Sequence, residues 1–189
     1  MTRPPKYSKA AMAQRLEQVF KENGYEGASL QLLAATTGLS KASLYHHFPS
    51  GKSEMAAHVL AYSGARLQKL VLGPLGAKNQ AGLLKSLAGT ANYYDGDIPI
   101  CLMNSLLLGE GRDLFGDRIQ TAVETWQSGL SGCLVGEGAA KAEAQAWAAD
   151  AIGRIQGALV LCRVQGSRGS LDDCLEGLTD DVESWLADG

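Results

Sequence analysis

Residues 29–48 contain two short apolar stripes on either side of a single glycine, Gly38. Leu44 and Phe48 recur at helical spacing after the glycine, and a similar stripe precedes it. Glycine tolerates the left-handed conformation that ends a helix, and Ser40 can cap the next helix by accepting a hydrogen bond from its free amides. The run therefore predicts two short helices joined by a tight turn, which is the spacing of a helix-turn-helix.

The side of the second helix opposite Leu44 and Phe48 carries hydrogen-bonding and small side chains, and it carries no carboxylate. A helix that lies in the major groove of DNA needs such residues near its N-terminus, where they reach base edges and phosphates. Ser29 and Gln31, at the start of the preceding helix, and Lys52, at the start of the following helix, can flank the same site. The candidate DNA-contacting residues are Ser29, Gln31, Lys41, Ala42, Ser43, Tyr45, His46 and Lys52.

Charge is distributed unevenly along the chain. Residues 1–70 hold nine Lys/Arg and four Asp/Glu, whereas residues 71–189 hold eight and sixteen. A basic head on an acidic body is typical of a protein that meets nucleic acid or a membrane surface. No apolar run reaches the roughly 18 residues of a membrane-spanning helix. We therefore expect double-stranded DNA, and no membrane, as the partner of the basic head.

Cysteine usage and the N-terminus bear on the compartment. The four cysteines are far apart and form neither a CxxC pair nor a zinc-binding spacing, which favours free thiols in a reducing cytosol. The stretch MTRPPKYSKAAM lacks the continuous apolar segment of a secretory signal. We therefore predict a cytoplasmic protein without a bound metal or cofactor.

The rest of the chain also has helical periodicity, and no window alternates as a strand does, so we predict an all-α fold of about nine helices. The first helix is expected to stop at Asn23-Gly24, and the helix that starts at Lys52 near Leu72. Further helices are expected over 79–94, 100–108 and 139–164. A last helix is expected to be capped by Ser170.

The run GYEGASLQLLAATTGLSKASLYHHFPSGKSEM resembles the DNA-binding domain of the TetR-type transcriptional regulators, over about residues 8–70. The turn from Phe48 to Lys52 is one residue longer than usual, which is similar to the LmrA/YxaF-like branch. The resemblance implies a three-helix DNA-binding domain in residues 1–70 and a helical ligand-binding and dimerisation domain in residues 71–189. It also implies a homodimer, most often a repressor, that a small-molecule effector releases from a palindromic operator.

Two further groups of residues follow from this resemblance. A pocket for a hydrophobic or aromatic effector would use apolar, aromatic and polar side chains of the middle helices, for which ordinary core packing is the alternative. The candidate ligand-binding residues are Tyr93, Tyr94, Cys101, Met103, Asn104, Leu107, Phe115 and Trp126. Apolar stripes on the last two helices would form the dimer interface, unless they pack only within their own chain. The candidate interface residues are Trp147, Ala151, Ala158, Cys162, Leu171, Leu178, Val182 and Trp185.

Three other functions compete with this interpretation. Cys101 stands near a predicted helix start, which lowers the pKa of a thiol, so a redox- or electrophile-sensing regulator is one alternative. Asp95 and Asp97 would oppose its ionisation. The second alternative is a module that binds a protein partner instead of DNA, and the basic N-terminal part of the chain argues against it. The third alternative is an enzyme. No catalytic motif supports it, and we do not expect the protein to be an enzyme.

Overall fold

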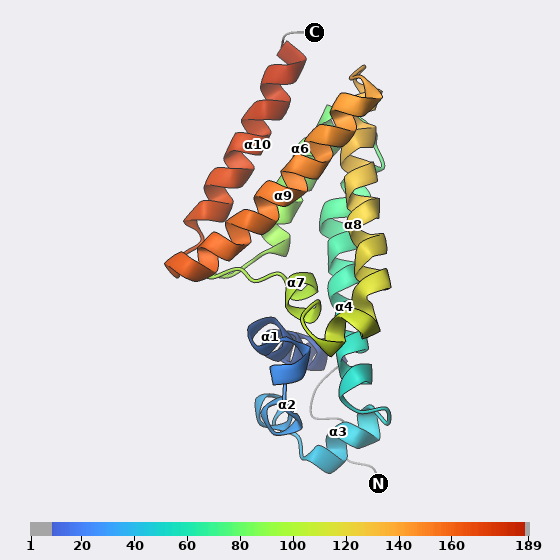
Figure 1. The fold of residues 1–189 in the computed structure, drawn as a ribbon, viewed down its shortest axis with the longest axis vertical. Helices are drawn as coiled ribbons and strands as arrows, with labels where there is room; N and C mark the ends of the chain where they lie inside the picture. Colours follow the sequence, from blue (N-terminus) through green and yellow to red (C-terminus); the bar gives the residue numbers. More distant parts are fainter. Residues whose placement is uncertain (1–8, 188–189) are drawn as a thin grey trace. The chain divides into compact units, whose positions relative to one another are not determined.

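The structure is a computed structural model that describes residues 9–187, and all regular structure in that range is helical (Figure 1). In chain order the elements are α1 (Lys9–Gly27), α2 (Leu30–Thr37), α3 (Lys41–His47), α4 (Lys52–Leu67), η1 (Gln68–Leu72), α5 (Gly73–Leu75), α6 (Gln80–Tyr93), α7 (Leu102–Leu106), α8 (Glu110–Gly136), α9 (Lys141–Gln165) and α10 (Gly169–Ala187). Because α4, η1 and α5 are contiguous, the described residues form nine helices when these three are taken as one. The predicted all-α class is confirmed.

Residues 1–8, most of the N-terminal stretch in which no secretory signal was recognised, lie outside the described residues. Within residues 9–187, no helix has both the length and the apolar content that crossing a bilayer requires.

The described chain forms two compact units. The first comprises the residues up to Ala65 together with Leu102–Ile119, and the second comprises Arg66–Cys101 together with the residues from Gln120 onward. The first unit thus includes a segment that a boundary after residue 70 assigns to the C-terminal domain. Helices α4 and α8 each contribute residues to both units.

In the first unit, α1 packs against α2 and α7, and α2 packs against α3. The core contains Leu16, Phe20, Leu33, Leu44 and Met55, all fully buried. Each such side chain contributes about 1.5–3 kcal/mol when it leaves water. The short helices α2 and α3 are therefore stabilised by their apolar sides, since helices of seven or eight residues are marginal in isolation.

The first helix differs from its predicted end. Gly24 has the left-handed φ of 67°, as expected of a terminating glycine, but helical turns resume after it and α1 ends at Gly27. A Cβ at Gly24 would lie 3.1 Å from the backbone oxygen of Ser105. Ser105 Oγ also donates a hydrogen bond to Lys21 O at 2.8 Å. The bend at Gly24 therefore coincides with close packing of α7 on α1.

In the second unit, α10 packs against α9 and α6, and α6 packs against η1 and α5. A Cβ at Gly89 would lie 1.8 Å from Leu70 O, so α6 and η1 can approach this closely only because a glycine stands at that position. The guanidinium of Arg168, in the α9–α10 loop, donates to Ala91 O at 3.0 Å and to Tyr94 O at 2.7 Å. A cation thus satisfies carbonyls at the C-terminal end of α6, where the helix dipole also favours it.

Three other predicted helix boundaries are wrong. The helix that starts at Lys52 does not stop at Leu72, since η1 and α5 follow it without a gap as far as Leu75, with Pro74 near the start of α5. Helix α7 is shorter than the predicted 100–108. Ser170 lies inside α10 and donates to Gln165 Oε1 at 2.7 Å, so it does not cap that helix.

Candidate nucleic-acid interface

Local hydrogen bonds define both ends of the turn between α2 and α3. Ser29 Oγ accepts from Leu32 N at 3.2 Å and caps α2. Gly38 ends that helix with φ 65° and ψ 24°, the left-handed conformation predicted for it. Ser40 Oγ accepts from Ser43 N at 3.1 Å and caps α3. The predicted glycine terminus and serine cap of the helix-turn-helix are therefore confirmed.

Helix α3 has one buried and one exposed side. Leu44 is fully buried and Phe48, which follows the helix, is 6% exposed, so both anchor α3 to the first unit. Tyr45 is 46% exposed on the other side. Lys41, Ala42 and His46 are also exposed, and Ser43 is half-buried. Of the α3 residues expected to meet DNA, all but the half-buried Ser43 therefore lie on the exposed side of that helix.

The exposed side of α3 carries no carboxylate. No Asp or Glu occurs anywhere between Glu26 and Glu54, so the segments on both sides of α3 also lack acids. The Glu54 carboxylate is engaged at the start of α4, where its Oε2 accepts from Ser50 N at 2.8 Å. Gly51 has φ 73°, and a Cβ there would lie 3.4 Å from the Tyr45 ring. The turn between α3 and α4 thus lies against Tyr45, and its nearest acid is bound to the backbone.

Lys52 has partners inside the first unit. Its Nζ lies 4.4 Å from the centroid of the Tyr25 ring and donates to Glu26 O at 3.4 Å. A cation over an aromatic face is attracted by the ring quadrupole. Lys52 therefore ties the first turn of α4 to the end of α1, a role that sequence reasoning did not assign to it.

The same end of α1 also holds the start of α8. Glu26 Oε1 accepts from Glu110 N at 3.0 Å and so caps that helix with a negative charge. The Tyr25 and Phe115 rings meet edge to face, with centroids 5.6 Å apart. The pKa of the Tyr25 hydroxyl is raised above its usual value, mainly by burial and secondly by the negative charge of Glu110. Phe115, a predicted ligand-binding residue, thus packs on α1.

The predicted ligand-binding residues are divided between the two units. Met103, Asn104, Leu107 and Phe115 belong to the first unit, and Tyr93, Tyr94, Cys101 and Trp126 belong to the second. All are buried except the exposed Asn104 and the half-buried Leu107.

In the second unit, Tyr94 OH donates to Cys101 Sγ at 3.5 Å and accepts from Gln156 Nε2 at 3.2 Å. Complete burial, followed by the neighbouring Cys101 and Tyr93, raises the pKa of Tyr94 well above its usual value. The hydroxyl therefore stays protonated and acts as a donor to the thiol sulfur.

The predicted dimer residues lie on the inner side of α9 and α10. Ala151, Cys162, Leu171, Leu178 and Val182 are fully buried within the chain. Ala158 is 6% exposed, and Trp147 and Trp185 are half-buried. Close packing of α9 against α10 accounts for their small and apolar character.

The opposite side of α9 carries a second apolar stripe, which sequence reasoning missed. This outer stripe of α9 consists of Ala146, Ala149, Gly153, Gly157, Val160 and Val164, all exposed. Val160 is 49% and Val164 78% exposed, and a Cβ at Gly153 or Gly157 would meet no atom within 4 Å. The spacing of three and four residues was visible in the sequence, but the two faces of α9 are both apolar, and spacing alone could not rank them.

Two models of known protein families match separate parts of the chain. A family model described as bacterial regulatory proteins, tetR family, matches residues 15–59. A second, described as the C-terminal domain of LmrA/YxaF-like transcriptional regulators, matches residues 91–176. The uncharacterized HTH-type transcriptional regulator YxaF of Bacillus subtilis (strain 168) is 25% identical over 133 residues, which cover 67% of this chain and 70% of YxaF.

Solved structures share the fold. A TetR transcriptional regulator from Legionella pneumophila superposes with a TM-score of 0.77 at 16% identity, over 95% of this chain and 99% of that one. A cysteine mutant of the TetR family regulator CifR, complexed with 26-base-pair operator DNA, superposes with a TM-score of 0.66 at 24% identity, over 98% of each chain. At such identities the likeness shows the fold alone. The two family models, which together match more than half of the chain, show that it belongs to the tetR family of DNA-binding bacterial transcriptional regulators, in the LmrA/YxaF-like branch.

Proposed function

We propose that the protein is a repressor that binds a palindromic operator as a homodimer and leaves it when a small effector binds. The observation that carries the proposal is the exposed, carboxylate-free side of α3, on a helix whose other side is buried. Such a surface can enter the major groove without repelling phosphate. The operator complex of CifR supports DNA as the partner.

Each exposed residue of α3 has a role that follows from its chemistry. Lys41 and Ser43 meet base edges or phosphates near the N-terminus of α3, and Ala42 permits close approach or contacts a thymine methyl. Tyr45 and His46 donate to backbone oxygens, and such contacts position the helix without reading sequence. Ser29 and Gln31 flank the same groove from α2.

Lys52 has a different role in this proposal from the phosphate contact expected at first. Its ammonium already has the Tyr25 ring and Glu26 O as partners. We assign it to positioning α4, the helix that follows the recognition helix α3.

The outer stripe of α9 is the surface we propose for the dimer. It is apolar, uncharged and open, and its small residues allow a second helix to approach closely. A twofold axis would set this stripe against its own copy, as in an isologous interface. The predicted residues on the inner side of α9 and on α10, by contrast, are buried within the chain.

Effector binding is favoured over thiol sensing by the surroundings of Cys101. Reactive cysteines are at least partly exposed and lie in electropositive surroundings. Cys101 is 5% exposed and has the Tyr94 hydroxyl as its neighbour, so oxidants have little access to it.

Two variants of Tyr45 test the docking of α3. Operator binding is measured by fluorescence anisotropy on a palindrome selected from random duplexes. Tyr45→Phe removes one hydroxyl donor to phosphate and should weaken binding about tenfold, the value of a hydrogen bond to a charged group. Tyr45→Ala should weaken it further and equally on every sequence, because backbone contacts do not read bases.

Ser43→Ala is the matched change on the same side of α3, and it should alter sequence preference instead. Circular dichroism checks that each variant is folded. Wild-type affinity for the operator in both Tyr45 variants would show that α3 docks differently or does not dock.

A further inference from the structure

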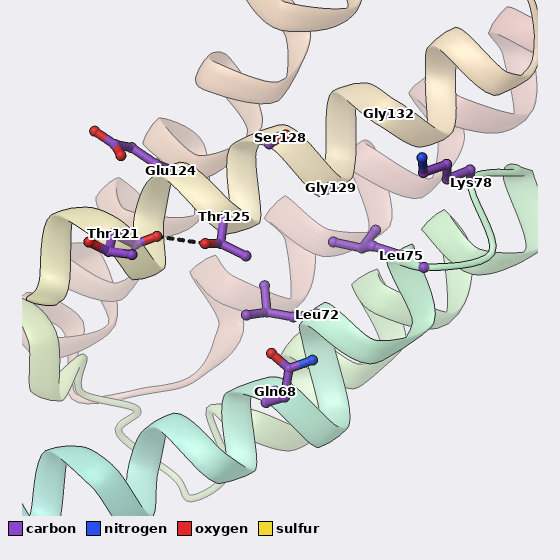
Figure 2. Close-up of a pocket in the computed structure, with 11 residues that line it drawn as sticks. Gln68, Leu72, Leu75, Lys78, Thr121, Glu124, Thr125, Ser128, Gly129 and Gly132 are labelled. Carbon is purple, nitrogen blue, oxygen red and sulfur yellow. Dashed lines mark hydrogen bonds between the residues drawn. The ribbon is translucent and has the colours of Figure 1, made fainter.

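A groove of about 510 Å³ opens within the second unit, between η1 and α5 on one side and α8 on the other (Figure 2). Its volume falls in the range of sites for small molecules, roughly 300–1,000 Å³. None of the residues predicted from sequence to bind the effector lines it.

Unusual backbone surrounds the groove. Gln68 and Leu72 line it from η1, a π-helical turn, and such turns occur frequently at functional sites. Lys78 lines one end with φ 49° and is the one non-glycine residue among residues 9–187 with positive φ. Conformations of this kind are strained and persist where the surrounding structure holds them.

The floor of the groove is apolar and partly lacks side chains. Leu72 and Leu75 point toward α8 in Figure 2. A Cβ at Gly129 would lie 2.8 Å from Leu75 Cδ1, so α5 touches α8 at that position. A Cβ at Gly132 would meet nothing within 4 Å, so the neighbouring turn of α8 is open. The groove can therefore hold an apolar body between the leucines and the glycine turn.

The charged groups differ at the two ends of the groove. Lys78 forms no ion pair within residues 9–187, which leaves its charge available to a ligand. Glu124 accepts from Gln120 Nε2 at 2.7 Å, and Figure 2 shows its carboxylate directed away from the two leucines. Lys78 is the one cation and Glu124 the one carboxylate among the lining residues, and Figure 2 shows them at opposite ends of the groove. The Lys78 end is therefore the one that favours an anionic group.

We propose that this groove is the effector site and that it takes a small amphipathic anion, with its apolar body on Leu72 and Leu75 and its head at Lys78. The regulatory role of the ligand rests on the proposed function, whereas its binding in the groove does not. Because η1 continues α4 without a break, a ligand that reshapes this π-helical turn acts on the helix that begins directly after the recognition helix.

Three probes with one tail and different heads test the ligand class. Decanoate, decanol and decyltrimethylammonium are titrated below their micelle concentrations, by calorimetry on the full chain without DNA. Decanoate should bind most tightly. Lys78→Asn should weaken decanoate about fivefold, the value of one partly exposed ion pair, and leave decanol unchanged. Asparagine tolerates positive φ, so this variant keeps the backbone.

A second variant fills the groove without disturbing the core. Gly132→Leu adds a side chain where a Cβ meets no atom and improves helix propensity, so the protein should fold and lose decanoate binding at least ~tenfold. Gly64→Leu is the matched control, since Gly64 is also helical and open, but lies outside the groove. Decanoate should release the operator from wild type and Gly64→Leu, and fail to release it from Gly132→Leu.

Several results would overturn the inference. Unchanged decanoate binding in Gly132→Leu would remove the groove as the site, and tighter binding of the ammonium probe would remove the anionic class. Binding in the groove without operator release would remove its regulatory role and leave the DNA-binding proposal intact. Failure of the ligand-free protein to bind any duplex would instead contradict the proposed function, and calorimetry would still decide whether the groove binds the anion.

Discussion

Single side chains determine the local geometry of the proposed DNA-binding surface. Ser40 caps α3 through Ser43 N, and Gly38 supplies the left-handed residue before it. The first turn of α3 contains no acid, although acidic residues are favourable at helix N-termini. The absence of an acid there gives up this stabilisation, as expected if the start of α3 meets a partner that is itself anionic.

Substitutions of Ser40 should separate stability from DNA binding. Ser40→Ala removes the cap and should lower the free energy of unfolding by about 1 kcal/mol. Ser40→Asp keeps a good cap and should preserve that free energy, but it places a carboxylate beside phosphate and should lower operator affinity. Ser40→Asn is the neutral control that should preserve both. Denaturant titration and anisotropy measure the two quantities, and equal operator affinity of the Asp and Asn variants would place the start of α3 away from DNA.

Among the elements, α9 has apolar residues on both faces. Its inner side packs on α10, while its outer stripe is exposed to solvent in the single chain. Gly153 and Gly157 are exposed and lie one helical turn apart. Each weakens an isolated helix by about 1 kcal/mol relative to alanine. Close approach of a second helix is a physical reason to keep them.

A charge placed on the outer stripe should separate the dimer. Gly157→Arg adds a long cation where a Cβ meets no atom, so the single chain should still fold. The same cation would be buried against its own copy in the dimer, where an unpaired charge is costly. Sedimentation velocity should show a monomer for Gly157→Arg and a dimer for wild type.

Gln14→Arg is the matched control for this change, because it adds the same charge at an exposed position of another helix, α1. A dimer that persists in Gly157→Arg would place the interface elsewhere. Loss of the dimer in both variants would indicate that net charge, and not the stripe, is responsible.

At the scale of the whole molecule, the positive charge gathers in the part of the chain that contains α1 to α4. Binding to DNA releases counterions, so the logarithm of affinity should fall linearly with the logarithm of salt concentration. Each phosphate contact contributes about 0.9 to this slope.

The salt slope should distinguish two lysines. Lys41→Met should reduce its magnitude by about 1, as expected of a lysine that meets phosphate. Lys52→Met should leave the slope unchanged and lower stability by about 0.5–1 kcal/mol, because its ammonium lies over the Tyr25 ring. Anisotropy titrations at several salt concentrations provide both slopes. A reduced slope for Lys52→Met would restore the phosphate contact expected from the sequence.

The sequence by itself determined the all-α class, the two helices around Gly38 and the polar side of α3. These features depend on interactions between residues at most a few positions apart, namely caps, a left-handed glycine and the spacing of Leu44 and Phe48. Local rules of this kind can be read without knowing the rest of the fold.

Only the tertiary structure decided which face of α9 is buried, because both of its faces are apolar and the choice depends on where α10 packs. It also decided that the Lys52 side chain lies over Tyr25, that residues 102–119 pack with the N-terminal helices, and that a groove opens beside Lys78. Each of these outcomes joins segments far apart in the chain, and sequence periodicity contains no information on which distant segments meet.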